Sequence, residues 1–277
     1  LASQTLIMEK LRVRRIAIEG ELPSGVFAKD IALHVIGRLG AKGGLGYAYE
    51  FSGSAIARLS MEERMTLCNM AIEGGARCGY VNPDETTFAY LRGRPFAPAG
   101  AAWDEAVARW RAVASDPDAS WDDDVVLRAE DLRPMVTWGT SPDQSVPVDA
   151  PVPDPLAEGE EAGSWQAAMD FMGVEPGRAV TGTRIDVAFI GSCTNGRLSD
   201  LEAVAAFLRR TGGRVAPHVR AMIVPGSRAV REAAIALGLD TLFAERGFEL
   251  RDAGCSLCCG MNADKLVGAQ VCASSSN

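Results

Sequence analysis

The stretch RIDVAFIGSCTNGR, residues 184–197, sets the architecture of the second half of this chain. Its opening run, RIDVAFIG, predicts a strand, and a polar loop containing Cys193 follows directly. Beyond it, segments with helical periodicity alternate with further short apolar runs. The expected helix, strand, helix and strand lie at residues 198–210, 219–224, 227–238 and 248–254. This alternation predicts a parallel sheet flanked by helices.

Three cysteines follow the ends of two of these expected strands. Cys193 comes after the first strand, and Cys255 and Cys258 come after the strand at 248–254. Because the carboxyl ends of parallel strands share one edge of a sheet, where ligands usually bind, we expect the thiols to meet there. A structural zinc or an electron-transfer cluster normally takes four protein ligands, so three thiolates would leave one coordination position open. From the spacing alone, an iron–sulfur cluster, a zinc site and a redox-active dithiol all remain open.

The first half of the chain also predicts an α/β arrangement. Residues 11–19 alternate between polar and apolar side chains as a strand does, an amphipathic helix is expected at 29–40, and another strand at 47–53. Ser60 and the glutamate three residues later form a capping-box signature, which predicts a long helix that runs to Ala76.

That predicted helix carries a second candidate site. Asn69 and Glu73 are four residues apart, so on a helix they would project from one face and could contact one ligand together. Periodicity assigns the opposite, buried face to Leu67, Met70 and Ile72. An Asn and a Glu at this spacing more often belong to a solvated face, so the spacing alone does not identify a site.

Composition divides the chain into two domains and a linker. Residues 141–162 contain five prolines and several acidic residues, which is too polar and too proline-rich for a core element. We therefore expect an α/β domain at 1–132, a linker at 133–163, and a second α/β domain with the cysteines at 164–277. The chain begins without Met, and its last residues show no helix or strand pattern, so we expect a fragment of a longer protein.

Charge and hydropathy exclude several classes of function. The net charge is −8, and Lys and Arg are scattered along the chain, which argues against nucleic acid or an anionic membrane as a partner. No apolar run is long enough to span a bilayer. The odd number of cysteines, seven, and the lack of a secretion signal indicate reduced thiols, and hence a cytoplasmic protein.

Several runs resemble the aconitase superfamily. GSCTN and GCxxC occur across that superfamily, whereas PDETTF and TWGT are similar to the isopropylmalate dehydratase branch of large subunits. The resemblance covers nearly the whole chain, in the runs MTLCNMAIEGGA at 65, PDETTFAY at 83, VTWGTSP at 136, IGSCTNGR at 190, VPGSRAV at 224 and GCSLCCGMN at 254. It implies an aconitase-like fold of two α/β domains.

The resemblance also implies a cofactor and an activity. The cofactor is one [4Fe-4S] cluster per subunit, held by Cys193, Cys255 and Cys258, with one iron free of protein ligands. Asn69 and Glu73 would lie beside that iron and hydrogen-bond its water or substrate. The implied activity is a hydro-lyase reaction that isomerises 2-isopropylmalate to 3-isopropylmalate through 2-isopropylmaleate in leucine biosynthesis.

A partner is implied as well. In this branch the serine base lies on a swivelling domain that is a separate small subunit, so a heterodimer and a small dicarboxylate substrate are expected. The family's proton-relaying histidines would precede Leu1 and its carboxylate-binding arginines would follow Asn277, so we expect this chain alone to be inactive. Homoaconitate, citramalate-type and citrate-type substrates remain alternatives. So does a catalytically incomplete, RNA-binding module, which the acidic charge disfavours.

Overall fold

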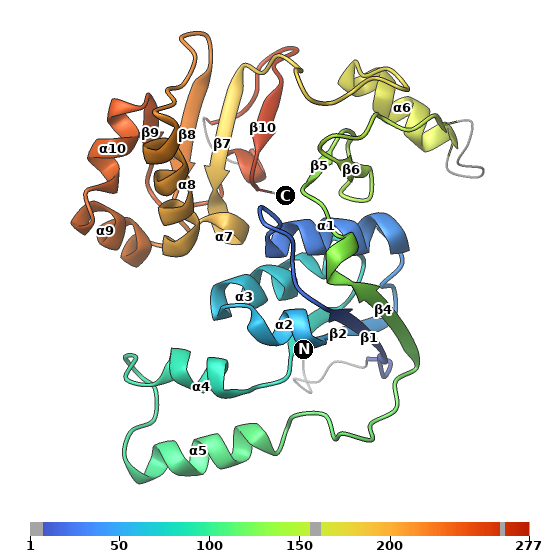
Figure 1. The fold of residues 1–277 in the computed structure, drawn as a ribbon, viewed down its shortest axis with the longest axis vertical. Helices are drawn as coiled ribbons and strands as arrows, with labels where there is room; N and C mark the ends of the chain where they lie inside the picture. Colours follow the sequence, from blue (N-terminus) through green and yellow to red (C-terminus); the bar gives the residue numbers. More distant parts are fainter. Residues whose placement is uncertain (1–7, 156–161, 261–263, 277) are drawn as a thin grey trace, which may run out of the picture. The chain divides into compact units, whose positions relative to one another are not determined.

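The computed structural model of this chain describes residues 8–155, 162–260 and 264–276. The chain divides into two compact units, Leu1–Thr181 and Gly182–Asn277. Each unit contains a four-stranded sheet in which every pair of neighbouring strands is parallel (Figure 1). The expected α/β class, with parallel sheets flanked by helices, is confirmed. The domain limits predicted at residues 132 and 163 remain predictions.

The sheet of the first unit has the order β3-β2-β1-β4. Its central strand β1 therefore pairs with β2 on one side and with β4, which comes much later in the chain, on the other. The strands are β1 (Arg12–Glu19), β2 (Tyr47–Ser52), β3 (Cys78–Val81) and β4 (Asp123–Arg128). The helices around them are α1 (Ala28–Leu39), α2 (Ser54–Arg58) and α3 (Met61–Met70).

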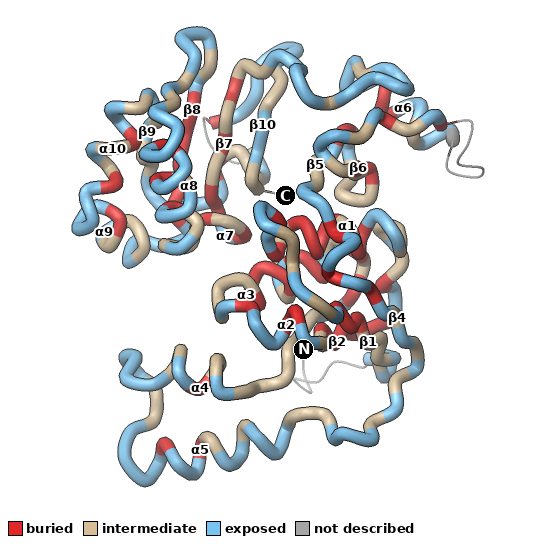
Figure 2. Tube along the Cα trace, viewed as in Figure 1, coloured by how far each residue is buried: buried red, intermediate tan, exposed pale blue. Residues whose placement is uncertain are grey.

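Apolar side chains from α1 and α3 pack on the strands of this sheet to form the core of the unit. Ile16 and Ile18 of β1 are fully buried, as are Ile31 of α1 and Leu67 of α3. Figure 2 shows the buried residues concentrated in the strands and along α1. Leu67 and Met70, near the carboxyl-terminal end of α3, belong to this core. That end of the helix is therefore packed firmly against the sheet and α1.

A long excursion separates β3 from β4. It contains α4 (Glu85–Leu91) and α5 (Ala101–Arg111), which Figure 1 shows as neighbouring helices. Phe88 of α4 stacks on Trp110 of α5, with ring centroids 6.1 Å apart, and Trp103 meets Trp110 edge-on at 5.6 Å. The excursion therefore has a small aromatic core of its own.

Two buried charges attach this excursion to the rest of the unit. The first is Arg64 of α3, 2% exposed, which donates to both carboxylate oxygens of Asp84 at 2.6 and 2.8 Å. Asp84 in turn caps α4 by accepting the backbone N–H groups of Thr86 and Thr87. The bidentate pair therefore fixes the start of α4 to α3.

The second anchor is Glu50 of β2, which is 2% exposed. Its carboxylate accepts hydrogen bonds from the Tyr80 hydroxyl at 3.1 Å and the Asn82 amide at 2.9 Å. It also accepts from the Ser115 hydroxyl at 2.8 Å and the Trp121 indole N–H at 2.9 Å. These donors flank both ends of the excursion, so one carboxylate joins both ends to the sheet.

The proline-rich segment expected to be a linker contains ordered structure. Strands β5 (Met135–Thr137) and β6 (Ser145–Pro147) form an antiparallel pair, and α6 (Ala162–Met172) follows. Trp138, Val146 and Met169 are buried together in a small cluster of their own. Residues 156–161 of the expected linker lie outside the described residues.

The sheet of the second unit has the order β10-β7-β8-β9. Its elements are β7 (Val187–Gly191), α7 (Ser192–Asn195), α8 (Leu198–Thr211), β8 (Arg220–Val224), α9 (Arg228–Ala236), α10 (Leu239–Glu245), β9 (Phe248–Leu250) and β10 (Cys272–Ser274). Ile223 packs with α8, α9 and α10, whereas Met222 and Val224 pack against Leu257 and Cys258 of the loop that follows β9. Three of the four strands were expected from the sequence, and β10 was not.

The described helices include none that is both long enough and apolar enough to cross a membrane.

The buried carboxylate of β2 yields a prediction about stability. We expect Glu50→Gln to lower the free energy of unfolding by about 2–4 kcal/mol, because the amide replaces a buried charged acceptor and leaves partly buried donors unsatisfied. Chemical denaturation followed by circular dichroism measures this change. Glu19→Gln is the matched control, since Glu19 on β1 is exposed and, among the described residues, accepts hydrogen bonds from Ser54 alone; its cost should stay below about 1 kcal/mol. Equal costs for the two variants would contradict the anchoring role.

Candidate cluster site

The turn after β7 exposes Cys193 at the end of the strand. Gly191 has φ +114°, and a Cβ built on it would lie 2.0 Å from the carbonyl oxygen of Val224, so only glycine fits. Ser192, which follows, has φ +67° and is fully buried. This sharp turn leaves Cys193 exposed on the short helix α7. A left-handed backbone at a non-glycine residue is uncommon and is concentrated at functional sites.

The second cysteine loop contains a similar turn. Beyond β9, a short 3-10 helix spans Ser256–Cys258, and the Cys258 N–H donates to the Cys255 carbonyl at 3.0 Å. Ser256 has φ +49° and is 6% exposed. The Gly260 N–H donates to the Ser256 carbonyl at 3.1 Å and closes the turn. Each predicted cysteine loop thus has a buried serine in a left-handed conformation directly beside a cysteine.

The thiols of the two loops lie close enough to influence one another. The pKa of Cys255 is raised above its ordinary value, first by a hydrogen bond with Cys259 and then by the nearby thiols, including those of Cys258 and Cys193. Cys193 and Cys255 are exposed, and Cys258 is half-buried. Cys259 is a neighbour of Cys255 that the sequence analysis did not single out, and the assignment of Cys193, Cys255 and Cys258 as cluster ligands stays a prediction.

The described residues do not present a preformed single-ion site. Across the described ranges, no group of three or more His, Cys, Asp or Glu side chains could hold a metal ion. In a tetrahedral zinc site the sulfur atoms lie about 3.8 Å apart, because each Zn–S bond is about 2.3 Å long. In an iron–sulfur cluster each cysteine binds a different iron atom, so the thiols surround a wider centre.

A buried hydroxyl beside Cys193 also fits a cluster. The Ser192 Oγ has no hydrogen-bond partner among the residues that the structure describes, and its side chain is fully buried. A buried hydroxyl without a partner costs free energy, and one that faces sulfur acceptors could recover it. The cysteine thiolates are soft metal ligands, and the Ser192 hydroxyl can donate a hydrogen bond to sulfur. These residues therefore fit a metal cluster that contains sulfur atoms. The sequence motif contained Ser192, but only the backbone conformation reveals its burial.

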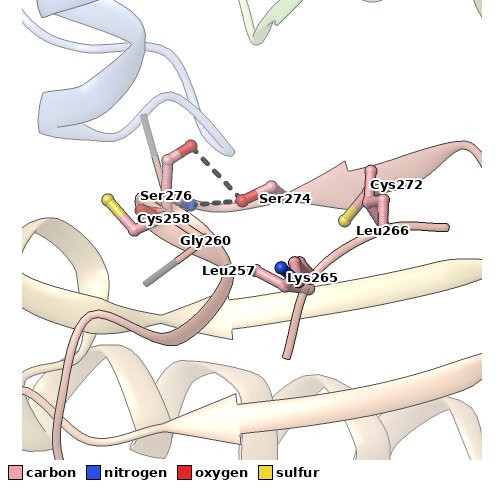
Figure 3. Close-up of a pocket in the computed structure, with 8 residues that line it drawn as sticks. All are labelled: Leu257, Cys258, Gly260, Lys265, Leu266, Cys272, Ser274 and Ser276. Carbon is pink, nitrogen blue, oxygen red and sulfur yellow. Dashed lines mark hydrogen bonds between the residues drawn. The ribbon is translucent and has the colours of Figure 1, made fainter. Parts of the chain in front are cut away.

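A shallow cavity of about 300 Å³ opens beside Cys258 (Figure 3). It lies between the loop after β9 and strand β10, and Figure 3 shows Ser274 and Ser276 hydrogen-bonded at one end. Its lining consists of Leu257, Cys258, Gly260, Lys265, Leu266, Cys272, Ser274 and Ser276. Hydroxyl and ammonium groups next to apolar side chains suit a small organic anion.

The capping box predicted at the start of α3 is present. The Ser60 Oγ accepts the Glu63 N–H at 3.3 Å, and the Ser60 N–H donates to the Glu63 Oε2 at 2.8 Å. These reciprocal bonds satisfy the backbone N–H groups of Ser60 and Glu63 at the start of the helix. Helix α3 begins at Met61 as expected.

The predicted end of this helix is wrong, because α3 stops at Met70 rather than at Ala76. The Ala76 N–H donates to the Ala71 carbonyl at 3.1 Å, and the Gly75 N–H donates to the Ile72 carbonyl at 2.9 Å. Gly75 has φ +85°. This pair of bonds around a left-handed glycine is a Schellman motif, which ends a helix by satisfying its last carbonyls.

The early helix end places the two residues of the second candidate site in different elements. Asn69 lies on α3 and is exposed, whereas Glu73 lies in the turn that closes the helix and is half-buried, and their contact with one ligand stays a prediction. Leu67 and Met70 are buried as predicted, but Ile72, which was assigned to the same buried face, is 57% exposed. Burial raises the pKa of Glu73 above its ordinary value. A carboxyl group with a raised pKa keeps its proton to a higher pH than an exposed glutamate does.

Comparison with known proteins identifies the family. The sequence profile of the aconitase family (aconitate hydratase) matches residues 1–277. The chain belongs to the aconitase family.

Several curated members of the aconitase family match this chain over its whole length. The 3-isopropylmalate dehydratase large subunit of Thermosynechococcus vestitus is 59% identical over 281 residues. The proteins of the same name from Opitutus terrae and Sorangium cellulosum are 55% and 56% identical. The chain spans 59% of the length of each of these relatives. The solved structure of Thermococcus kodakaraensis aconitase X (holo-form) shares 13% identity, with a TM-score of 0.43 over 89% of this chain and 44% of that one, which adds nothing to the assignment.

The cysteines outside the cluster loops yield a prediction about reactivity. Burial raises the pKa of the Cys68 thiol to about 11, whereas Cys78 on the neighbouring strand β3 is exposed. Because the thiolate is the reactive form, iodoacetamide at about pH 8 should label Cys68 roughly 100-fold more slowly than Cys78. Mass spectrometry of tryptic peptides measures the two rates. Labelling in denaturant, where both should react alike, is the control, and equal rates in the folded chain would contradict the assigned burial.

Proposed function

We propose that this chain forms part of the large subunit of a 3-isopropylmalate dehydratase. The proposed reaction converts 2-isopropylmalate to 3-isopropylmalate through 2-isopropylmaleate, a step of leucine biosynthesis. The observation that carries the proposal is the 55–59% identity to relatives of that name over the whole chain. The position of Cys193 after β7 and of Cys255 after β9, two strands of one parallel sheet, supports it, because ligands usually bind at the carboxyl ends of such strands.

Three cysteines are proposed to hold the cofactor, a [4Fe-4S] cluster. Cys193 would bind from the loop after β7, and Cys255 and Cys258 from the loop after β9. When bound, a cluster with one iron free of protein ligands supplies a Lewis acid for the hydroxyl group that leaves. The protein's part is to fix the thiols: a left-handed serine beside Cys193 and another beside Cys255 turn the backbone so that both side chains face outward.

Asn69 and Glu73 are proposed to contact the substrate or its water. The Asn69 side chain is exposed at the end of α3, where its amide can donate and accept hydrogen bonds. Burial raises the pKa of the Glu73 carboxyl, so this group holds a proton at a higher pH than an exposed glutamate does. A group tuned in this way can move a proton to or from a bound diacid.

The name of the relatives also supports a partner. We propose that the large subunit works with a separate small subunit in a heterodimer and acts on a small dicarboxylate, in the cytoplasm. The groups that this chain does not supply, including the base and the arginines expected for the substrate carboxylates, would come from the rest of the large subunit and from the small one.

The cofactor assignment predicts the result of removing one thiol. In the full-length large subunit, Cys255→Ser should abolish the brown absorbance at about 400 nm and the activity, because the cluster loses one of its three protein ligands. Cys78→Ser is the matched control, since Cys78 is an exposed cysteine of the other unit, and it should keep both. Full colour in Cys255→Ser would refute the assignment. Formation of aconitate but not isopropylmaleate by the reconstituted wild-type pair would refute the substrate.

The substrate-contact assignment predicts a separate effect. Asn69→Ala and Glu73→Gln should keep the cluster absorbance but lower kcat by about 10²–10⁴, because each removes a group that contacts the reacting molecule. Steady-state assays of the full-length pair of subunits measure kcat. Glu62→Gln, in the first turn of the same helix, is the control and should retain activity. If the three variants have equal activities, the assignment of Asn69 and Glu73 is wrong.

A further inference from the structure

Asp264 is a nearly buried carboxylate in the segment that follows the second cysteine loop. It is 4% exposed, and it accepts hydrogen bonds from two arginines and a serine. Arg251 Nη2 donates to both of its oxygens, at 2.9 and 3.2 Å, and Arg220 Nη2 donates at 2.9 Å. The Ser256 hydroxyl donates at 3.0 Å. A buried carboxylate with two arginines and a hydroxyl has its charge compensated and its position fixed.

The bond to Ser256 reaches the middle of the cysteine loop. Ser256 lies directly after Cys255 and two residues before Cys258, and its φ of +49° is a left-handed conformation. That conformation costs free energy in a residue with a side chain, so it persists only where other contacts hold it. The hydrogen bond from the buried hydroxyl to Asp264 is such a contact.

The two arginines connect this contact to the sheet. Arg220 is the first residue of β8, and Arg251 directly follows β9, so both start from rigid strands. Glu249 of β9 also lies near both arginines, at 3.9 and 3.0 Å, but its side chain is 51% exposed. The arginines thus have two carboxylate partners, of which Asp264 is the buried one that also bonds to Ser256.

We propose that Asp264 is a positioning residue for the cluster: through Ser256 it holds Cys255 and Cys258 in their ligand-ready arrangement before the cluster binds. The proposal rests on the proposed function for the cluster itself. The chemistry is that of an outer-shell partner, which orients ligands without touching the metal, and loss of such a partner typically weakens metal binding about 10–100-fold.

The first test needs no cluster. In the cluster-free, full-length subunit, hydrogen exchange followed by mass spectrometry reports the backbone bonds of the loop, which are made by the N–H groups of Cys258 and Gly260. Asp264→Asn and Ser256→Ala should both speed exchange in this peptide. Glu249→Gln, which alters the same arginine pair without the bond to Ser256, should leave it unchanged. Equal exchange in Asp264→Asn and Glu249→Gln would overturn the proposal.

The second test measures how firmly the reconstituted cluster is held. We expect Asp264→Asn to lose its absorbance to a chelator about 10–100-fold faster than Glu249→Gln, while thermal unfolding of the two variants stays similar. If Asp264→Asn does not fold, Ser256→Ala decides, because it removes only the hydroxyl. Unchanged cluster loss in the variant that folds would overturn the proposal. A wild-type subunit that binds no cluster would instead overturn the proposed function, and the exchange rates would still decide whether Asp264 fixes the loop.

Discussion

The close approach of Gly191 to the carbonyl oxygen of Val224 is the constraint on which the cysteine site depends. With only 2.0 Å available for a Cβ, no other residue can occupy that position, so the chain must turn sharply where β7 ends. The turn buries Ser192 and exposes Cys193. Parallel pairing of β7 with β8, and of β8 with β9, then places the second cysteine loop at the same edge. Strand pairing therefore places two cysteine loops that are some sixty residues apart in the chain after strands of the same sheet.

Regular elements could be predicted from the sequence because their signals are local. The alternation around residues 184–254 gave strands β7, β8 and β9 and helices α8 and α9 in the right order, although it missed α10, and the capping box at Ser60 marked the start of α3. The end of α3 was missed because the apolar spacing continues to Ile72, while the glycine at position 75 closes the helix with bonds that periodicity does not report. Strand β10 was missed because its three residues become a strand only by pairing with β7.

The candidate site, like the fold, could be predicted from the sequence only in part. The cysteines could be found from their motif and spacing, because thiols are rare and chemically distinctive. The groups that shape their loops could not, because Asp264 and Ser256 have ordinary sequence neighbourhoods and acquire meaning only through a bond between them. Backbone conformation is also invisible in the sequence, and a serine with positive φ looks like any other serine until the chain is folded.

The excursion between β3 and β4 has a consequence of a different kind. Its helices pack on each other through Phe88, Trp103 and Trp110, and the buried side chains Arg64 and Glu50 attach it to the unit near its two ends. The loop between α4 and α5 has a fully exposed Phe96, and none of its residues is among the described residues that form the core of the sheet. Insertions and deletions there need not disturb the strands, so this is the place where related chains can differ in length while their cores stay alike.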